Sequence, residues 1–275
     1  MPTAIRSLNW PHLLLLLALW PYAALTAEAG WSPDLVLGGG TLGALLWLML
    51  WERLLPLRQQ WQARPAELKR DGAFLGINAV ADAAAGFVLT GLALYGANLQ
   101  PEAGLAAGLP PLLALPLAIA LGELGPFALH RLAHRRPWAW RIHELHHRPT
   151  KLNAANSVLA HPLNVIWNKL ARVLPWLLLG FDQTTMLWAA LFMQVQGIAV
   201  HANIRGSLGP LDRLIGSAEL HRWHHSVIEA EAHNYGTAIP LWDQLFGSYV
   251  RRPGEQPRTV GIFGGQVRAA KARDP

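Results

Sequence analysis

The chain has 275 residues, of which 52% are hydrophobic and 15% are charged, whereas a soluble domain has about 25% charged residues, so the composition predicts a membrane protein. It contains no cysteine, which excludes disulfides, iron–sulfur clusters, thiolate metal sites and thiol nucleophiles. The net charge of +6 does not indicate nucleic-acid binding, because the basic residues lie beside apolar spans, where Arg and Lys of cytoplasmic loops are usually found.

Four apolar stretches are long enough to cross a bilayer, which takes about 20 helical residues. They cover residues 8–27, 35–51, 73–99 and 103–122, and Asp82 is an acid inside the third. The first stretch can also be read as a signal peptide, with Arg6 before its leucine run. We expect two helical hairpins within residues 1–122.

The charges of the connecting loops predict the orientation of these hairpins. The segment 52–71 contains five basic residues, whereas the connections 28–34 and 98–110 contain none. The positive-inside rule places the basic loop in the cytoplasm, and with it the region that follows the fourth span. This predicts an integral protein of a bacterial inner membrane.

A second apolar region follows Lys151, over residues 152–168 and 173–201, and charged residues interrupt it. This pattern predicts a hairpin that dips into the bilayer or lies along its interface. The sequence ends in a basic tail, 268–275, which we expect to be disordered.

The predicted fold is an all-α integral membrane helical bundle, with about four transmembrane helices plus a shallow hairpin and a cytoplasmic histidine-rich metal-binding cap. We expect three parts: membrane hairpins in 1–122, a histidine-rich catalytic region in 123–250 and a basic C-terminal tail in 251–275.

The histidines are concentrated in the C-terminal half, where "HRLAH", "HELHH" and "HRWHH" form three clusters. Residues three and four apart share one face of a helix, so each cluster projects two or three imidazoles in one direction. Burying so many imidazoles without a ligand would be costly. We expect the clusters to converge with His201 into a metal cage, with His161 as a further candidate. One metal cannot use so many ligands, but two metals can share them. The cluster residues are His130, His134, His143, His146, His147, His221, His224 and His225. His12 and His233 are expected to be hydrogen-bonded or interfacial residues.

The stretch "HELHH" also matches the zinc-protease motif H-E-x-x-H, in which His143 and His147 would bind zinc and Glu144 would be the general base. The cluster "HRWHH" has the same histidine spacing but carries Arg222 in place of the glutamate. The shared feature is therefore the histidine spacing, and the cage is the favoured interpretation. An intramembrane zinc protease stays an alternative. A metal transporter or sensor is another, and it would require ionisable residues inside the spans.

The order HxxxH, HxxHH and a distal HxxHH resembles the fatty acid hydroxylase / sterol desaturase superfamily of membrane di-iron enzymes. The resemblance runs from Glu123 to Tyr249. It includes the acid seven residues before the first histidine, an Asn followed by "HP" after the second cluster, "NYG", and "WDQLFGSY". Two departures are Phe127, where Tyr is common, and Gly197, where some relatives carry a histidine. The resemblance implies that four polar residues support the histidines: Glu123, Asn153, Asn234 and Asp243.

The resemblance further implies two non-haem irons, bound by the clustered histidines and His201. Such a pair activates O2 to hydroxylate or desaturate a C–H bond of a lipid drawn from the bilayer, of the fatty acyl, sterol or hopanoid, or carotenoid type. The electrons must come from an external donor, of the ferredoxin or cytochrome b5 type with its reductase. The chain itself has no cysteine for an iron–sulfur centre and no dinucleotide-binding fingerprint.

Overall fold

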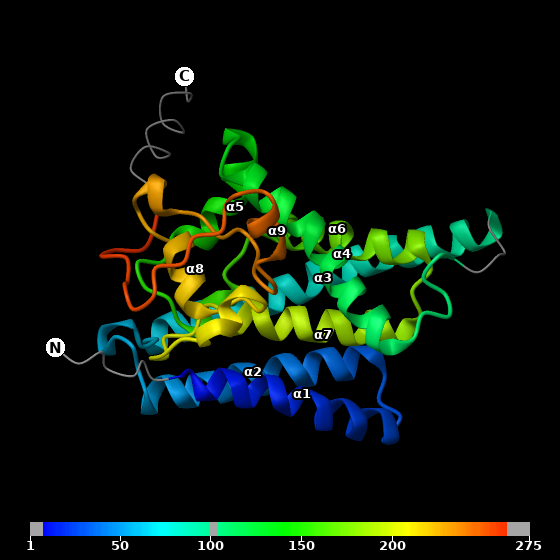
Figure 1. Cartoon of the computed structure of the whole chain (residues 1–275), viewed down its shortest axis with the longest axis horizontal. Helices are drawn as coiled ribbons and strands as arrows, with labels where there is room; N and C mark the ends of the chain where they lie inside the picture. The colour runs from blue at the N-terminus through cyan, green and yellow to red at the C-terminus, as the bar shows by residue number, and fades with distance from the viewer. Residues whose placement is uncertain (1–7, 100–103, 263–275) are drawn as a thin grey trace.

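The structure is a computed structural model, and it describes residues 8–99 and 104–262. Within these two ranges the chain forms helices and turns and no strands. The long helices lie side by side as a bundle, and α5, α8 and α9 gather at one end of it, which we call the cap (Figure 1). The α-helices are α1 (Trp10–Glu28), α2 (Pro33–Leu54), α3 (Pro65–Leu99), α4 (Pro111–Ala133), α5 (Pro137–His147), α6 (Pro162–Leu179), α7 (Gln183–Ala199), α8 (Ala218–His224) and α9 (Leu241–Leu245). Four short 3-10 turns are η1 (Gln59–Trp61), η2 (Ala154–Val158), η3 (Gly209–Arg213) and η4 (Glu229–Glu231).

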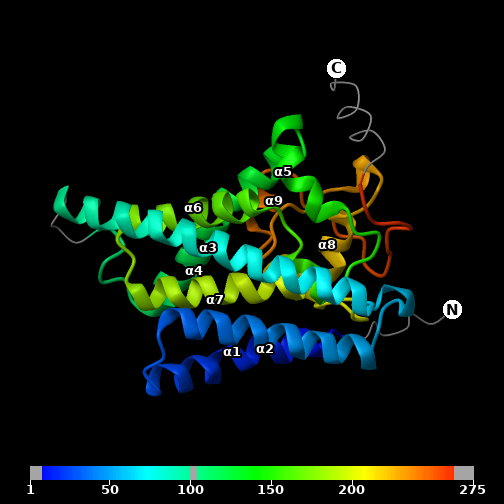
Figure 2. The same ribbon diagram turned by 180° about the vertical axis from the view of Figure 1, so that it is seen from behind.

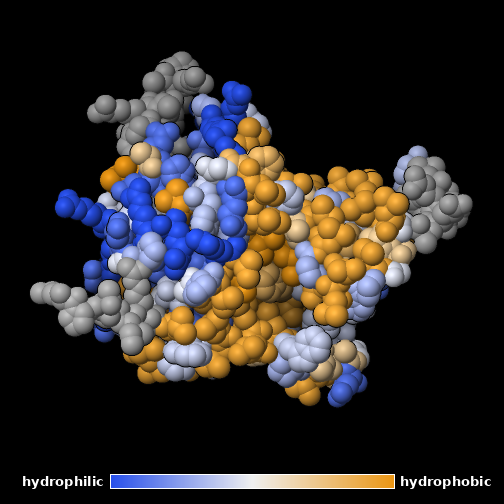
Figure 3. Space-filling view, in the orientation of Figure 1, coloured by the Kyte–Doolittle hydropathy of each residue, from blue (hydrophilic) through white to orange (hydrophobic). Residues whose placement is uncertain are grey.

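In the part of the chain that the structure describes, four helices are long and apolar enough to cross a membrane: α1, α2, α3 and α4. The all-helical integral membrane prediction is thereby confirmed. Local signals set where helices begin. Asn9 accepts the His12 N–H at the start of α1, Ser32 accepts the Leu35 N–H at the start of α2, and Asp182 accepts the Thr185 N–H before α7. Apolar residues cover the bundle, and hydrophilic residues gather over the cap (Figure 3).

Helices α3 and α4 differ in their boundaries from the predicted spans. Helix α3 begins at Pro65 rather than at 73, because the Glu67 carboxylate accepts the Arg64 N–H and caps a helical turn made of polar residues. Helix α4 runs over Pro111–Ala133 rather than 103–122. The charge of Glu123 does not end α4, because its carboxylate is buried and accepts backbone N–H groups of Thr237 and Ala238. The last turn of α4 therefore carries His130 towards the cap.

The predicted second hairpin consists of α6 and α7, but its predicted arms, 152–168 and 173–201, are wrong: residues 169–172 lie inside α6, and the chain turns at 180–182. Helix α6 packs against α3 and α4, and α7 packs against α2 and α4. Seen from behind, α7 lies between the α1–α2 pair and the rest of the bundle (Figure 2). The α6–α7 connection passes close to residue 104, since a Cβ on Gly180 would lie 2.7 Å from the Gly104 Cα. Gly180 also ends α6 with a φ of 71°.

Residues 251–262, the first part of the predicted tail, pack on the cap. The Gly254 N–H donates to Glu219 Oε1 at 2.9 Å and Arg222 Nε donates to Gln256 Oε1 at 2.6 Å, and both Glu219 and Arg222 lie on α8. Arg251 also pairs with the buried Asp212 at 3.0 Å. The predicted disordered segment 268–275 and Arg6 of the signal-peptide reading lie outside the described residues.

Candidate metal centre

Four elements bring the predicted histidines together at the junction of bundle and cap. Helices α4, α5 and α8 each end in one of the three clusters, and His201 follows directly on α7. The side chains form two sets, and within each set the candidate ligand nitrogens lie within 4.8 Å of one another. The first histidine group is His130, His134, His143, His147 and His224. The second histidine group is His146, His201, His221 and His225.

The remaining histidines lie outside both groups. His161 caps α6, where its Nδ1 accepts the Leu163 N–H at 3.1 Å. His12 is fully buried in α1, with its Nε2 2.5 Å from Gln196 Oε1. His233 contributes its backbone carbonyl, which lies 3.1 Å from His224 Nδ1.

Hydrogen bonds at Nδ1 orient five of the nine clustered imidazoles. Their acceptors are the carbonyls of Tyr235 for His130 (2.7 Å), Leu159 for His146 (3.3 Å), Gly197 for His201 (2.8 Å) and His233 for His224 (3.1 Å), and the Asn164 Oδ1 for His143 (2.8 Å). A carbonyl oxygen can only accept, so each of these Nδ1 atoms carries the proton. In a neutral imidazole the Nε2 atom then carries a free lone pair, as a metal ligand requires.

The Nε2 atoms face one another at separations that fit bound ions. His146 Nε2 lies 3.1 Å from His201 Nε2, and both rings carry their proton on Nδ1. No proton is left to join these two nitrogens, so their lone pairs repel unless a cation lies between them. Two ligands about 2.1 Å from one ion and at right angles to each other lie about 3 Å apart. In the first group, His130 Nε2 is buried and has no hydrogen-bond partner among the residues that the structure describes. The residues present therefore fit a metal in each group.

Burial keeps these imidazoles neutral. It lowers the pKa of His146 to about 4 and, together with the neighbouring His146, lowers the pKa of His201 to about 3. Burial, followed by the proximity of other imidazoles, holds the pKa values of the following residues well below the usual range: His134, His143, His147, His221, His224 and His225. At neutral pH protons therefore do not compete with a metal for the lone pairs.

Three of the predicted supporting residues hold the segment 234–238 against the first histidine group. The Asp243 carboxylate accepts the N–H groups of Tyr235 and Gly236 at 2.8 and 2.7 Å. The Glu123 carboxylate accepts the N–H groups of Thr237 and Ala238. Asn234 has a φ of 60° and bonds to the backbone of Val250 through both ends of its amide. These contacts fix the Tyr235 carbonyl that orients His130.

The fourth predicted supporting residue, Asn153, lies elsewhere. It caps η2, where its Oδ1 accepts the Asn156 N–H at 3.1 Å, and its Nδ2 donates to the Trp61 carbonyl. Asn153 therefore orders the turn that leads to Leu159, whose carbonyl orients His146.

Among the residues in contact with the first group, Asn164 and Trp140 are not among the predicted supporting residues. Asn164, in the first turn of α6, orients His143. The Trp140 ring lies 5.2 Å from that of His134 and 5.3 Å from that of His147, and Trp140 is buried. In the sequence, Asn164 is an ordinary polar residue shortly after the "HP" pair. It can be recognised as a supporting residue only when the packing of α6 against the histidines is known.

The geometry of Glu144 does not support the zinc-protease alternative. Its Oε1 accepts from Arg148, the residue after α5, at 2.8 Å, and the side chains of Glu144 and Arg148 are 24% and 58% exposed. Glu144 belongs to neither histidine group. A general base in that motif would have to reach a metal-bound water, and this carboxylate is instead paired at the surface.

Comparisons with known proteins agree with this geometry. A family model described as "Fatty acid hydroxylase" matches residues 115–248. Ornithine lipid hydroxylase OlsE of Rhizobium tropici is 29% identical over 275 residues, an alignment that covers 95% of this chain and 80% of that protein. Very-long-chain aldehyde decarbonylase GL1-8 of Oryza sativa subsp. indica is 28% identical, covering 43% of this chain and 45% of that protein.

Methylsterol monooxygenase 1 of Rattus norvegicus is 29% identical, covering 46% of this chain and 42% of that protein. This chain thus spans less than half the length of the decarbonylase and of the sterol enzyme. No solved structure matches the chain. The matched region contains every residue of both histidine groups, and the family model and the ornithine lipid hydroxylase relative support the fatty acid hydroxylase / sterol desaturase superfamily as the family of this chain.

Proposed function

We propose that the protein is a membrane-bound di-iron oxygenase that uses O2 to hydroxylate or desaturate a C–H bond of a membrane lipid. The observation that carries the proposal is the pair of histidine groups, five and four imidazoles, at one end of an apolar helical bundle. Imidazole ligands alone suit iron, zinc, copper and nickel. The superfamily, with its hydroxylases and monooxygenases, favours iron.

The two groups would each hold one iron, and the bound pair would supply the O2 activation and the oxidising power for an unactivated C–H bond. The protein's own contribution is orientation and exclusion of water. The Nδ1 hydrogen bonds fix the ring planes, so that the Nε2 lone pairs converge before a metal arrives. The rings of Trp140 and Tyr235 both pack beside His134, and Phe127 packs on Tyr235 with ring centres 6.3 Å apart.

The substrate is proposed to enter laterally from the bilayer, because the cage lies directly at the end of lipid-facing helices. One relative that aligns with nearly the whole chain is an ornithine lipid hydroxylase. A membrane lipid that carries an amino acid is therefore the first substrate to test, ahead of fatty acyl, sterol or hopanoid and carotenoid compounds. The electrons are proposed to come from a ferredoxin or a cytochrome b5 type protein with its reductase.

The orientation follows the loop charges. Arg58 and Arg64 lie in the α2–α3 connection at the cap end, so we propose that the cap faces the cytoplasm from the inner membrane. On this proposal, residues 1–122 serve mainly as membrane hairpins, 123–250 carry catalysis, and 251–275 form a basic tail whose first part packs on the cap.

The test is metal content together with lipid turnover. Protein from iron-replete cells should hold close to two irons per chain by elemental analysis. A membrane-lipid extract incubated with reductant and O2 should contain products that have gained one oxygen or lost two hydrogens by mass spectrometry, and incubation without O2 should give none. The matched control is His161→Ala, which changes a histidine outside both groups and should keep both properties. One zinc and no iron, repeated under iron supplementation, would contradict the proposal.

A further inference from the structure

A buried carboxylate in the N-terminal hairpin bonds to two segments of the cage region. Glu52 lies near the end of α2 and is 4% exposed. Its Oε1 accepts the Ala154 N–H at 2.6 Å and the Asn203 N–H at 2.8 Å. These donors are 102 and 151 residues away in the chain. Glu52 lies outside the region 115–248 that matches the family model.

The first of the two segments follows His201. Asn203 lies two residues after this histidine, and its side chain exchanges two hydrogen bonds with the backbone of Arg58, at 3.0 and 2.9 Å. The Leu57 N–H donates to the Asn203 carbonyl, and the Arg205 N–H donates to the Leu55 carbonyl. The connection after α2 is thus paired with the backbone that follows His201, and Glu52 closes one end of this pairing.

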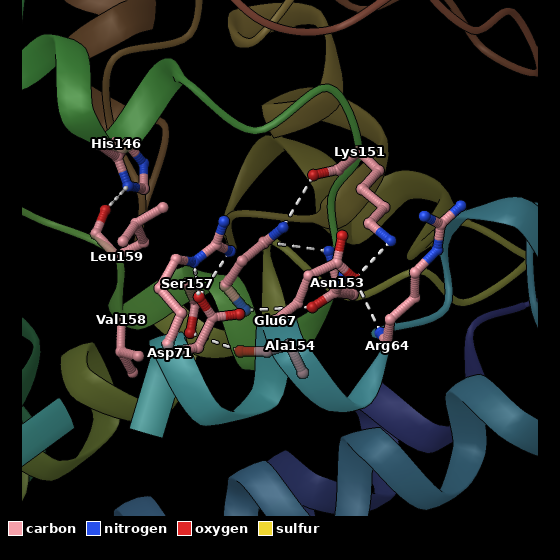
Figure 4. A network of polar contacts seen from close by, with 12 residues as sticks. Arg64, Glu67, Asp71, His146, Lys151, Asn153, Ala154, Ser157, Val158 and Leu159 are labelled. Atoms are coloured by element: carbon pink, nitrogen blue, oxygen red, sulfur yellow. Dashed lines mark hydrogen bonds and ion pairs between the residues drawn. The ribbon is translucent and has the colours of Figure 1, made fainter. Parts of the chain in front are cut away.

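The second segment is η2, which begins at Ala154 and leads to Leu159. The Leu159 carbonyl accepts from His146 Nδ1, as Figure 4 shows. Helix α3 holds the same segment from another side: Asn78 Nδ2 donates to the Val158 carbonyl at 2.7 Å, and Glu67 pairs with Lys151 at 2.6 Å. The position of the Leu159 carbonyl therefore depends on contacts with both α2 and α3.

Both segments lead to the second histidine group. His146 and His201 belong to it, and their Nε2 atoms are 3.1 Å apart. The contacts that orient the first group come instead from the segment 233–238 and from Asn164. We propose that Glu52 is a positioning residue for the second histidine group, and that the N-terminal membrane hairpin is thereby a structural part of one of the two metal positions. This inference rests on the proposed function, in which each group holds one metal.

Removal of the carboxylate should affect the two metal positions unequally. Glu52→Leu keeps a similar volume but leaves two buried backbone N–H groups without an acceptor, so the segments at 154 and 203 must shift. Loss of a contact that orients a metal ligand lowers metal affinity by about tenfold to a hundredfold. We expect Glu52→Leu to retain about one metal where the wild type holds two. Glu52→Gln retains an oxygen acceptor and should hold nearly two.

The experiment titrates iron or cobalt(II) into metal-free protein and measures the number and affinity of bound ions. The matched control is Glu144→Leu, which removes a carboxylate of α5 that pairs with Arg148 and belongs to neither histidine group. It should bind two metals with wild-type affinity. In combined variants, His201→Ala added to Glu52→Leu should cost little further binding, whereas His134→Ala added to Glu52→Leu should remove the remaining ion.

The outcomes separate the inference from the proposed function. If wild-type protein fails to bind two metals, the proposed function fails. If wild type binds two and Glu52→Leu also binds two with unchanged affinities, or loses both equally, the positioning role is overturned. Should Glu52→Leu not fold, Asn203→Ala decides, because it loosens the same junction from the other side. Asn203→Ala should lower the metal affinity of the second histidine group about tenfold and leave that of the first group unchanged. Equal loss of affinity at both groups would overturn the inference.

Discussion

At the scale of single residues, the two readings of "HELHH" predict opposite effects of two substitutions. In a zinc protease, Glu144→Gln would abolish activity with the metal still bound, and His146→Ala would be tolerated. In the metal-cage interpretation, Glu144 has no role at the metals, because it pairs with Arg148 at the surface, whereas His146 belongs to the second histidine group. We therefore expect Glu144→Gln to keep iron content and lipid oxidation. His146→Ala should lose iron and oxidation.

The matched variant is His224→Ala, which occupies the same place in "HRWHH" but belongs to the first histidine group. It should behave like His146→Ala when bound iron and O2-dependent lipid conversion are measured side by side. A His146→Ala protein with full iron and full activity would rule out the cage assignment.

Asn164 gives a second prediction at this scale. Its Oδ1 accepts from His143 Nδ1 at 2.8 Å, and both residues are buried. Asn164→Leu leaves that N–H without an acceptor and frees the ring to turn, so metal affinity should fall by about tenfold to a hundredfold. Asn164→Asp keeps an oxygen at the same place and should retain binding. Competition with a chelator of known affinity measures the difference, and equal affinities of the two variants would contradict a role in orienting His143.

The site was predictable from the sequence where it depends on spacing, and not where it depends on distant contacts. The i, i+3 and i+4 spacing identifies three clusters, because helix geometry places such residues on one face. The Glu52 carboxylate gives no such signal. In the sequence it is the first charge after an apolar span, as at any membrane boundary, and its partners lie more than a hundred residues away.

At the scale of helices, contacts between distant residues also explain why the boundaries of α4 could not be predicted from the sequence. The charges at Glu123 and Arg131 suggest that the apolar span ends near 122. The helix continues to Ala133, and tertiary contacts hold two of its polar side chains: Glu123 accepts two backbone N–H groups from the segment after Tyr235, and His130 donates to the Tyr235 carbonyl. Hydropathy alone cannot distinguish a helix that ends at the membrane boundary from a helix that continues into a functional site.

The pair Asp82–Lys169 gives a prediction for helix packing. Lys169 Nζ on α6 lies 2.6 Å from Asp82 Oδ2 and 2.9 Å from the Asp82 carbonyl on α3, midway along the bundle. An unpaired charge in apolar surroundings is costly. Lys169→Met should therefore lower the free energy of unfolding by at least about 1 kcal/mol in lipid nanodiscs, and Asp82→Asn added to it should recover part of the loss.

The control for this pair is Arg148→Met, which breaks an exposed ion pair with Glu144 on one helix. Pairs of this kind contribute about 0.5 kcal/mol or less. Thermal unfolding of the variants in nanodiscs measures the comparison. Strictly additive effects of Lys169→Met and Asp82→Asn would show that the pair does not join α3 to α6.

At the scale of the whole molecule, the four spans and the cap determine which side of the membrane supplies electrons. The α2–α3 connection is at the cap end, and the α1–α2 connection is at the opposite end of the bundle (Figure 1). A soluble electron donor in the cytoplasm can reach the cage only if the cap faces that side. The proposed donor and the proposed orientation therefore depend on each other.

The orientation can be tested with single cysteines, because the natural chain contains none. Ala29, between α1 and α2, and Gln60, in η1 at the cap end, are both exposed. A membrane-impermeant maleimide added to spheroplasts should label Ala29→Cys and not Gln60→Cys, and inverted membrane vesicles should give the reverse. Val80→Cys, on a 72% exposed position in the middle of α3, should resist labelling from both sides because lipid covers it. Labelling of Gln60→Cys in intact spheroplasts would place the cap outside the cytoplasm, and a cytoplasmic donor could then no longer supply the electrons.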